Sequence, residues 1–196
     1  MSKLKLNFSI RDITIIAALS ALGGLAVVPM ANLWYIATLS IGSMADAIFG
    51  GINFWNYMLA AALVRKPGTA LSVGLLTGAV ELVMGNQAGV AVLGWTILNG
   101  IAIEIIFAMV NYKDYSYVTM LMGGAVGGEI GRVWSAILYG WDVMDPENWT
   151  PLPLSMLTGA IISGTIAYLL LLFLRRSGLV RQSSGDTGEA GFANPT

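Results

Sequence analysis

The sequence predicts an all-α integral membrane protein, a six-transmembrane-helix bundle with its N and C termini in the cytoplasm. Its 196 residues are 56% hydrophobic and 11% charged, whereas about a quarter of the residues of a soluble domain are charged. The apolar residues fall into six segments, each long enough to cross a hydrocarbon core of about 30 Å. Nine of the ten Lys and Arg residues lie on one predicted side of these segments, and the tenth, Arg132, lies within the fifth segment.

The segments follow one another with short connections. We expect spans at residues 10–28, 44–64, 70–84, 90–110, 118–139 and 154–174. Residues 31–41 form an apolar stretch with Trp34 and Tyr35, and we expect this stretch to loop at the outer interface. Gly50 and Gly51 interrupt the second span, because glycine weakens a helix interior.

The cationic residues give the orientation. They lie before the first span, between the second and third, between the fourth and fifth, and after the sixth: Lys3, Lys5, Arg11, Arg65, Lys66, Lys113, Arg175, Arg176 and Arg181. The intervening connections carry none, and the last is acidic at residues 142–147. Excess Lys and Arg mark the cytoplasmic side. We therefore expect a membrane domain at residues 1–182 and a polar, disordered cytoplasmic tail at residues 183–196.

Missing residue types exclude several classes of function. The chain has no His and no Cys, which removes the commonest general base and the commonest ligands for zinc, copper and haem. It also has no nucleotide-binding motif. We expect no catalytic residues, no metal site, no cofactor and no nucleic-acid partner. If ATP drives transport, another chain hydrolyses it.

Polar residues and indoles within the spans are the candidate substrate-binding residues, because charge at bilayer depth is costly. With a rise of 1.5 Å per residue, they converge in the outer half of the bundle: Asp46, Glu81, Asn86, Trp95, Asn99, Glu129, Arg132 and Trp134. Glu81 lies about one turn from the outer surface. It has no cationic neighbour in its own span, so its partner must come from another segment or from a ligand.

Structural roles compete with binding at several of these positions. Glu129 and Arg132 are three residues apart and can pair, either to pin the bundle or to bind a ligand. Trp134 could belong to an interfacial aromatic belt, although its depth favours stacking on a ligand. Asn99 could bridge helices. Glu104, nearer the cytoplasmic side, could be neutral or paired with a neighbouring helix.

Small residues form a second pattern. The first span has Ala17 and Ala21 four residues apart, a spacing that lets another helix approach closely. This face could contact another subunit. In the fifth span, Gly127 and Gly131 have the same spacing, and packing within the bundle explains them.

A longer pattern lies at residues 65–89. The run RKPGTAL at residues 65–71, followed by Glu81 and the run GNQAG at residues 85–89, resembles the YkoE-type substrate-binding subunits of energy-coupling factor (ECF) transporters. The six-segment layout extends the resemblance over most of the chain. It implies the fold of an ECF S component, which captures a vitamin while a transmembrane coupling subunit and two cytoplasmic ATPases drive transport. It also implies that Ala17 and Ala21 contact the coupling subunit.

The resemblance implies a substrate-specific subunit of an ECF-type ABC importer for thiamine or its hydroxymethylpyrimidine precursor. Thiamine is a cation with an aromatic pyrimidine, so Glu81 and Glu129 could pair with it and Trp134 could stack on it. The alternative is a self-sufficient proton-coupled carrier for a small cationic or aromatic solute, with Glu104 joining the two other glutamates in a relay. An integral membrane enzyme is a third reading, which the lack of His and Cys disfavours.

Overall fold

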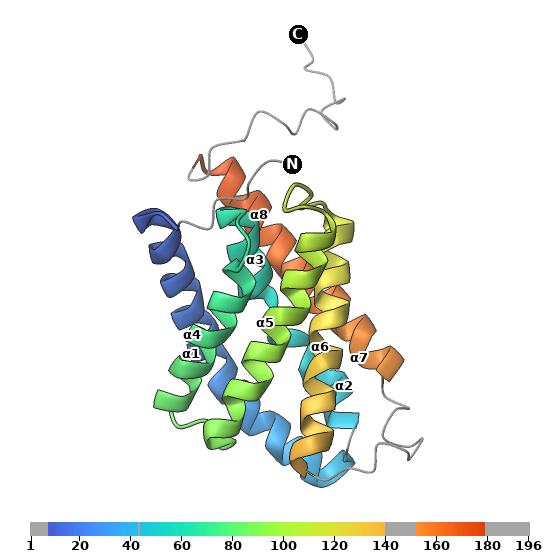
Figure 1. Cartoon of the computed structure of the whole chain (residues 1–196). Coiled ribbons are helices and arrows are strands. Elements are labelled where there is room, and N and C mark those ends of the chain that lie inside the picture. The colour runs from blue at the N-terminus through green and yellow to red at the C-terminus, as the bar shows by residue number, and fades with distance from the viewer. Residues whose placement is uncertain (1–7, 43, 140–151, 179–196) are drawn as a thin grey trace.

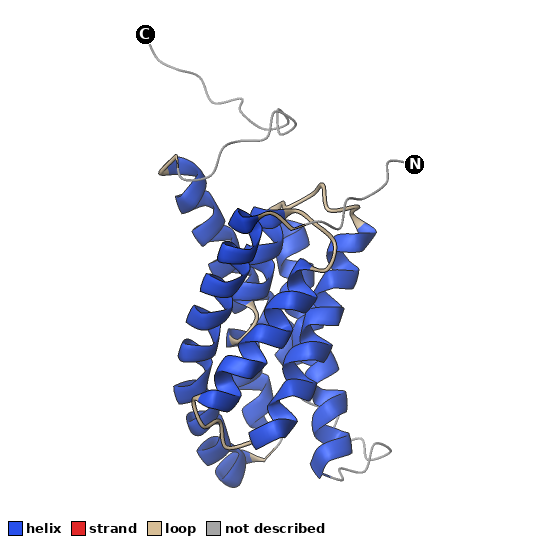
Figure 2. Cartoon of the chain, turned by 60° about the vertical axis from the view of Figure 1, so that its left-hand side comes forward, coloured by secondary structure: helices blue, strands red, loops and turns tan. Residues whose placement is uncertain are grey.

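The computed structural model describes residues 8–42, 44–139 and 152–178, and all regular structure in these ranges is helical. The elements run in the order α1 (Ile10–Ile41), α2 (Met44–Phe49), η1 (Gly50–Ile52), α3 (Trp55–Val64), α4 (Thr69–Val83), η2 (Gly89–Ala91), α5 (Val92–Met109), α6 (Tyr117–Tyr139), α7 (Leu152–Gly159), the π-helical η4 (Ala160–Gly164) and α8 (Thr165–Arg176). They form one elongated bundle (Figure 1), and Figure 2 shows the helices running along its long axis. The predicted tail at residues 183–196 and the acidic loop at 142–147 lie outside the described ranges.

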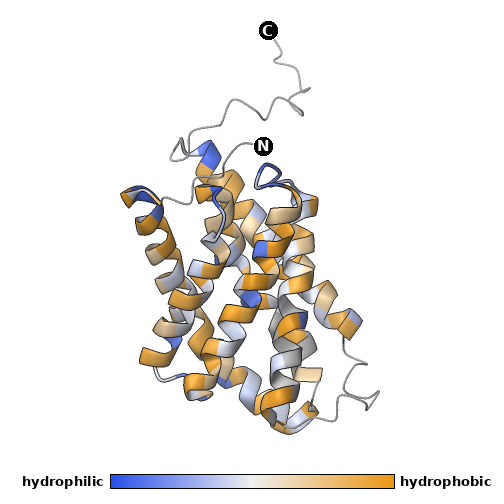
Figure 3. Ribbon diagram, in the orientation of Figure 1, coloured by the Kyte–Doolittle hydropathy of each residue, from blue (hydrophilic) through white to orange (hydrophobic). Residues whose placement is uncertain are grey.

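The helices suit a membrane by their surface, but within the described residues only three of the six predicted spans reach the expected membrane-spanning length. Within the described ranges, α1, η2 with α5, and α7 through α8 are each long and apolar enough to span a bilayer. The helices α3, α4 and the first part of α6 are shorter apolar helices. Large apolar side chains such as Leu25, Leu75 and Ile105 are about half exposed on the sides of the bundle, where Figure 3 shows mainly hydrophobic residues. This surface is compatible with lipid rather than water.

The two ends of the bundle differ in charge. The start of α1, the end of α8, and the α3–α4 and α5–α6 connections share one end, which carries Arg65, Lys66 and Lys113 and is called here the cationic end (Figure 1). The α4–α5 connection at residues 84–88 lies at the other end, called here the α4–α5 end. The predicted grouping of basic connections is therefore found in the fold.

The first helix is longer than predicted. Residues 31–41 do not form a loop, because α1 continues as a helix to Ile41, and that expectation was wrong. Pro29 lies inside the helix, where it removes a backbone hydrogen bond and crowds the preceding turn. Figure 1 shows the part of α1 after this point running across the α4–α5 end. Trp34 therefore sits on a helix that reaches the other spans.

The second and sixth spans are both irregular, and their irregular parts meet. The predicted interruption at Gly50 and Gly51 is confirmed as the 3-10 turn η1, whereas the π-helix η4 was not predicted. An ideal Cβ on Gly51 would lie 2.5 Å from the backbone carbon of Thr158, so only glycine fits there. The hydroxyl of Ser163 donates to the Gly51 carbonyl and accepts from the Phe54 N–H. One side chain thus satisfies backbone groups that a broken helix leaves open in lipid.

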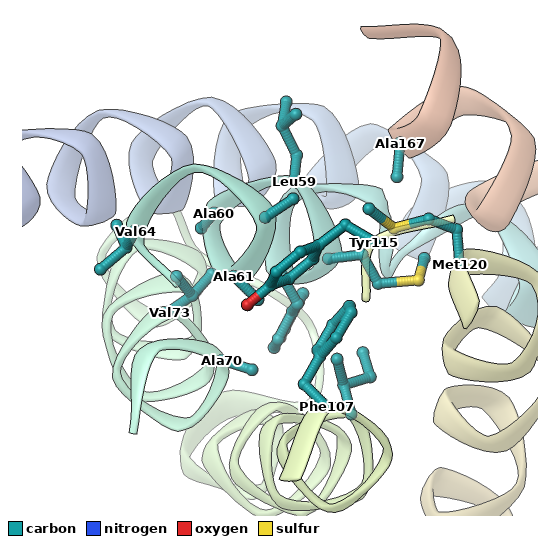
Figure 4. Close-up of a cluster of buried hydrophobic side chains, with 14 of the residues drawn as sticks. Leu59, Ala60, Ala61, Val64, Ala70, Val73, Phe107, Tyr115, Met120 and Ala167 are labelled. Atoms are coloured by element: carbon teal, nitrogen blue, oxygen red, sulfur yellow. The ribbon is translucent and has the colours of Figure 1, made fainter. Parts of the chain in front are cut away.

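The hydrophobic core lies toward the cationic end. Figure 4 shows side chains from α3, α4, α5, α6 and α8 around Phe107 and Tyr115, whose rings stack with centroids 5.2 Å apart. Along α5, the buried apolar residues Ala102 and Ile103 follow the buried polar residues Thr96 and Asn99. The buried polar groups of α5 therefore lie between this core and the α4–α5 end.

Candidate substrate-binding site

Glu81 is a buried carboxylate at the α4–α5 end. Its side chain is 3% exposed, two residues before α4 ends at Val83. It accepts a hydrogen bond of 2.8 Å from the Asn86 side-chain amide. The Asn86 carbonyl oxygen accepts in turn from the Ala88 N–H at 3.0 Å, in a turn that begins at Gly85 with φ of 78°. Asn86 therefore orients the carboxylate, which contacts no Lys or Arg in the part of the chain that the structure describes.

The frame below Glu81 is closely packed. An ideal Cβ on Gly78 would lie 2.2 Å from the Thr96 hydroxyl oxygen, so α4 and α5 meet with no room for a side chain. One turn before Glu81, Thr77 accepts a 3.1 Å hydrogen bond from the Asn56 amide. Asn56 also donates to the Leu19 carbonyl at 3.4 Å. Helices α1, α3 and α4 are thus joined directly beneath the carboxylate.

Two indoles approach each other near the same end. Trp95 on α5 and Trp34 on α1 make an edge-to-face contact with centroids 6.4 Å apart. Beside them, Gln87 donates a 2.7 Å hydrogen bond to Asn32 of α1. The sequence identified Trp95 but missed Trp34 as a site residue. The signal that could have revealed it is the uninterrupted run of helix-compatible residues after Pro29.

Asn99 is a buried amide on α5, 6% exposed. Among the described residues, its side-chain oxygen has no hydrogen-bond partner. The same holds for the side-chain oxygens of Asn56 on α3 and of Asn53, between η1 and α3. The Asn99 side-chain oxygen therefore gives no support to the helix-bridging role considered for this residue. Sequence reasoning missed Asn53, because an uncharged amide beside a glycine pair does not stand out in a search for ionisable residues.

Glu129 and Trp134, both on α6, help to hold helices together. Ser155 of α7 donates a short hydrogen bond to the Glu129 carboxylate. The Trp134 indole N–H donates to the Ala91 carbonyl at 3.0 Å, and its ring fills the space beside Gly94. These contacts do not test stacking on a ligand, which stays a prediction.

Two predicted site residues lie outside what can be described. Asp46 belongs to α2 and Arg132 to α6, but their side chains are outside the described part of the structure. The predicted pairing of Arg132 with Glu129 therefore also stays a prediction.

Glu104 does not belong to this site. Its carboxylate accepts from the N–H groups of Gly68 and Ala70 at 2.5 and 2.8 Å, and from the Tyr112 hydroxyl at 2.6 Å. The first N–H groups of a helix lack partners within it and favour negative charge, so Glu104 caps α4 from α5. Of the two roles considered for Glu104, the contact with a neighbouring helix is the one that the structure shows. Burial, together with the hydrogen bond to Glu104, raises the pKa of Tyr112 in the α5–α6 connection above its ordinary value.

The RKPG run has a structural task at the cationic end. Arg65 adopts a left-handed backbone with φ of 55°, and its guanidinium lies 4.9 Å from the centroid of the Tyr115 ring. Lys66 forms a salt bridge of 2.6 Å with Asp12 at the start of α1. The run therefore connects α1, α3 and the α5–α6 connection, far along the bundle from Glu81.

The small residues of α1 differ in burial. Gly23 and Gly24 are buried, and added Cβ atoms would clash with Asn56 and Val80. Ala17 is exposed and Ala21 partly exposed. On α6, Gly127 packs against Phe54 and Ile103, which confirms internal packing for that glycine.

Comparisons with known proteins place these features in a family. Residues 11–130 match the family model described as ABC-type cobalt transport system, permease component. The chain is 22% identical over 161 residues to the putative HMP/thiamine permease protein YkoE of Bacillus subtilis (strain 168), covering 82% of this chain and 81% of that protein. A crystal structure of an S-component of an ECF transporter superposes with a TM-score of 0.81 at 21% identity, covering 88% of both chains. The predicted helical fold of an ECF S component is thereby confirmed, while the cytoplasmic location of both termini stays a prediction.

Proposed function

Because the chain belongs to the family of ABC-type cobalt transport system permease components and has the fold of an ECF S component, we propose that it captures thiamine or its hydroxymethylpyrimidine precursor. It is a multi-pass protein of the plasma membrane and a transporter component. The proposed site lies at the α4–α5 end, which we assign to the outside of the cell, with both termini in the cytoplasm. The protein binds and releases its ligand without chemical conversion.

Glu81 is the observation that carries this proposal. A buried carboxylate is costly unless charge or hydrogen bonds compensate it, and Glu81 receives one amide hydrogen bond from Asn86. A ligand with positive charge or an amino group supplies the missing partners. Trp95 and Trp34 place indole rings at the same end, where they suit an aromatic or cationic ring. Thiamine and hydroxymethylpyrimidine combine these properties, and the relative YkoE is named for both.

A cobalt ion fits the candidate residues less well than an organic ligand does. Imidazole nitrogen is a common protein ligand for transition metals such as cobalt(II). The chain contains neither His nor Cys. Within the described ranges, no group of three or more His, Cys, Asp or Glu residues could hold a metal ion. The cobalt in the family's name is therefore not carried over to this chain.

The partners in this proposal are a transmembrane coupling subunit and two cytoplasmic ATPases, in keeping with the S-component fold. We assign the coupling contact to the face of α1 that carries Ala17 and Ala21, which remain accessible. A self-sufficient proton-coupled carrier is not favoured. Its relay would need Glu104, whose carboxylate is engaged by two backbone N–H groups and a tyrosine hydroxyl.

Ligand identification tests the proposal. Purified protein in detergent is analysed by mass spectrometry for co-purifying compounds and titrated separately with thiamine, hydroxymethylpyrimidine and cobalt(II) chloride. We expect saturable binding of one or both organic compounds and none of cobalt. Binding of cobalt alone would overturn the proposal and indicate that the metal in the family's name is also the ligand of this chain.

A further inference from the structure

Three buried asparagine side-chain oxygens have no hydrogen-bond partner among the residues that the structure describes. They belong to Asn53, Asn56 and Asn99. The Asn56 side chain is anchored through its amide nitrogen, which donates to Thr77 and Leu19, and Asn99 as a whole is 6% exposed. Most buried polar groups are hydrogen-bonded, and an unsatisfied one costs about 1–3 kcal/mol. The oxygens of Asn53 and Asn99, whose side chains lack the anchoring hydrogen bonds of Asn56, call for an explanation.

The packing brings the two residues to neighbouring positions. Phe54 directly follows Asn53, and Ile103 lies one turn after Asn99 on α5. An ideal Cβ on Gly127 of α6 would lie 3.1 Å from Phe54 and 3.4 Å from Ile103. Phe54, Ile103 and Gly127 therefore form one packed layer across α3, α5 and α6.

Both asparagines lie on the same side of that layer. The second span begins at the α4–α5 end with α2, and α5 also begins there. Asn53 and Asn99 precede Phe54 and Ile103 in sequence, so both lie between the layer and the α4–α5 end. The same region carries Glu81 and Trp95.

The helix break fixes Asn53 in this position. Ser163 accepts from the N–H of Phe54 at 3.1 Å and donates to the Gly51 carbonyl. Asn53 lies between these two anchored residues, outside both η1 and α3. Its place is therefore set by the contact between the second and sixth spans rather than by a helix of its own.

We propose that Asn53 and Asn99 are a pair of amide acceptors that receive N–H donors from the bound ligand. This inference rests on the proposed function and adds a rule of specificity. With the Glu81 carboxylate, the site offers acceptors from three segments and selects an amino-substituted ring. A ligand that carries a carboxylate in place of the amino group places acceptor against acceptor and is rejected.

The first test needs no ligand. Replacing an unsatisfied buried amide with an apolar side chain of similar size removes a desolvation cost, so Asn53→Leu and Asn99→Leu should keep or raise the melting temperature of the ligand-free protein. Asn56→Leu is the control, because it removes a similarly unpaired oxygen together with the hydrogen bonds that the Asn56 amide donates to Thr77 and Leu19. It should lower the melting temperature by about 2 °C or more. An equal fall in all three variants would show that the amides are structural and overturn the proposal.

The second test measures specificity with two probes. Each variant is titrated with hydroxymethylpyrimidine and with the analogue in which a methyl group replaces the amino group. The wild-type protein should bind the amino compound at least about tenfold more tightly. Asn53→Leu and Asn99→Leu should lose most of this preference, chiefly through weaker binding of the amino compound.

The outcomes separate the inference from the proposed function. Wild-type binding with an undiminished preference in both variants would overturn the acceptor pair and leave the proposed function intact. Failure of the wild-type protein to bind either the amino compound or thiamine would overturn the proposed function and the acceptor pair with it.

Discussion

At the scale of single residues, the two glutamates Glu81 and Glu104 show how neighbours decide the role of a carboxylate. Each is an isolated carboxylate in an apolar span. From the sequence alone, burying either one in the membrane should cost a similar free energy. Glu104 accepts from the first N–H groups of α4, while Glu81 is held by one amide. The location of a helix N-terminus beside Glu104 depends on the packing of α4 on α5. Sequence spacing alone therefore could not distinguish the structural carboxylate from the candidate ligand carboxylate.

The substitution Glu81→Gln tests the second of these roles. It keeps the size of the side chain but removes its charge, so a charge-assisted hydrogen bond worth roughly 1.5–3 kcal/mol is lost. We expect affinity for thiamine or hydroxymethylpyrimidine to fall about tenfold or more, as measured by titration. The ligand-free melting temperature should change little. Unchanged affinity would remove Glu81 from the site and leave Glu129 and Trp134 as candidates.

Glu104→Gln should show the opposite pattern. The neutral amide caps the α4 N-terminus more weakly and brings an N–H group where the carboxylate only accepts. We expect a melting temperature lower by about 2 °C or more, with affinity nearly unchanged in the folded fraction. A strong loss of affinity without a loss of stability would place Glu104 in the ligand path and revive the carrier alternative.

Asp114, in the α5–α6 connection, gives a prediction about pH. Its carboxylate accepts from the Thr119 hydroxyl at 2.6 Å and from the Ser116 N–H at 2.9 Å. The Thr119 hydrogen bond, followed by the Ser116 bonds, holds its pKa below the ordinary value. A lowered folded-state pKa stabilises the protein above the unfolded-state pKa, and this stability is lost as pH falls through the folded value. Melting from pH 7 down to about 3 should show the wild type's advantage over Asp114→Asn shrinking. An advantage independent of pH would exclude this linkage.

At the scale of elements, the ends of most helices could be predicted from the sequence, whereas the irregular parts could not. The fourth span was expected at residues 90–110 and forms as Val92–Met109, because hydropathy over a membrane-length window is a strong signal. The extension of α1 beyond Pro29 was missed. A proline at that point suggests a helix end, but the Asn32–Gln87 hydrogen bond and the Trp34–Trp95 contact hold the extension against other elements. The π-helix η4 also depends on a distant partner, since its Ser163 bonds to η1.

The contact between the two irregular spans yields a prediction at Ser163. Ser163→Ala leaves the Gly51 carbonyl and the Phe54 N–H without this partner, in a region with no bulk water. Each unsatisfied group costs about 1–3 kcal/mol, so the melting temperature should fall clearly. Ser40→Ala is the control, because Ser40 is exposed and its hydroxyl donates to the Ile36 carbonyl within α1. If both variants melt like the wild type, the two breaks are not held together by Ser163.

At the scale of the whole molecule, the polar groups are divided between two tasks at opposite ends. The cationic end uses its charges internally: Lys66 pairs with Asp12, and Arg65 lies over Tyr115. The α4–α5 end instead keeps a buried carboxylate with one amide donor. This asymmetry suits a protein that binds a ligand at one end and presents a rigid body to its partner subunits. A buried polar group with few hydrogen-bond partners inside the protein can gain them from the ligand.

The last prediction concerns the face of α1 to which we assign the contact with the coupling subunit. Leucine at Ala17 or Ala21 would hold an approaching helix away, since close packing in lipid needs small side chains. We expect ligand binding to persist while co-purification with the coupling subunit and ATPases is lost. Ala26→Leu is the matched control, because Ala26 is also exposed and lies about half a turn around α1 from Ala17. Assembly that survives leucine at both Ala17 and Ala21 would place the coupling contact elsewhere on the bundle. Loss of assembly in all three variants would show that α1 as a whole, rather than its small face, is sensitive to added bulk.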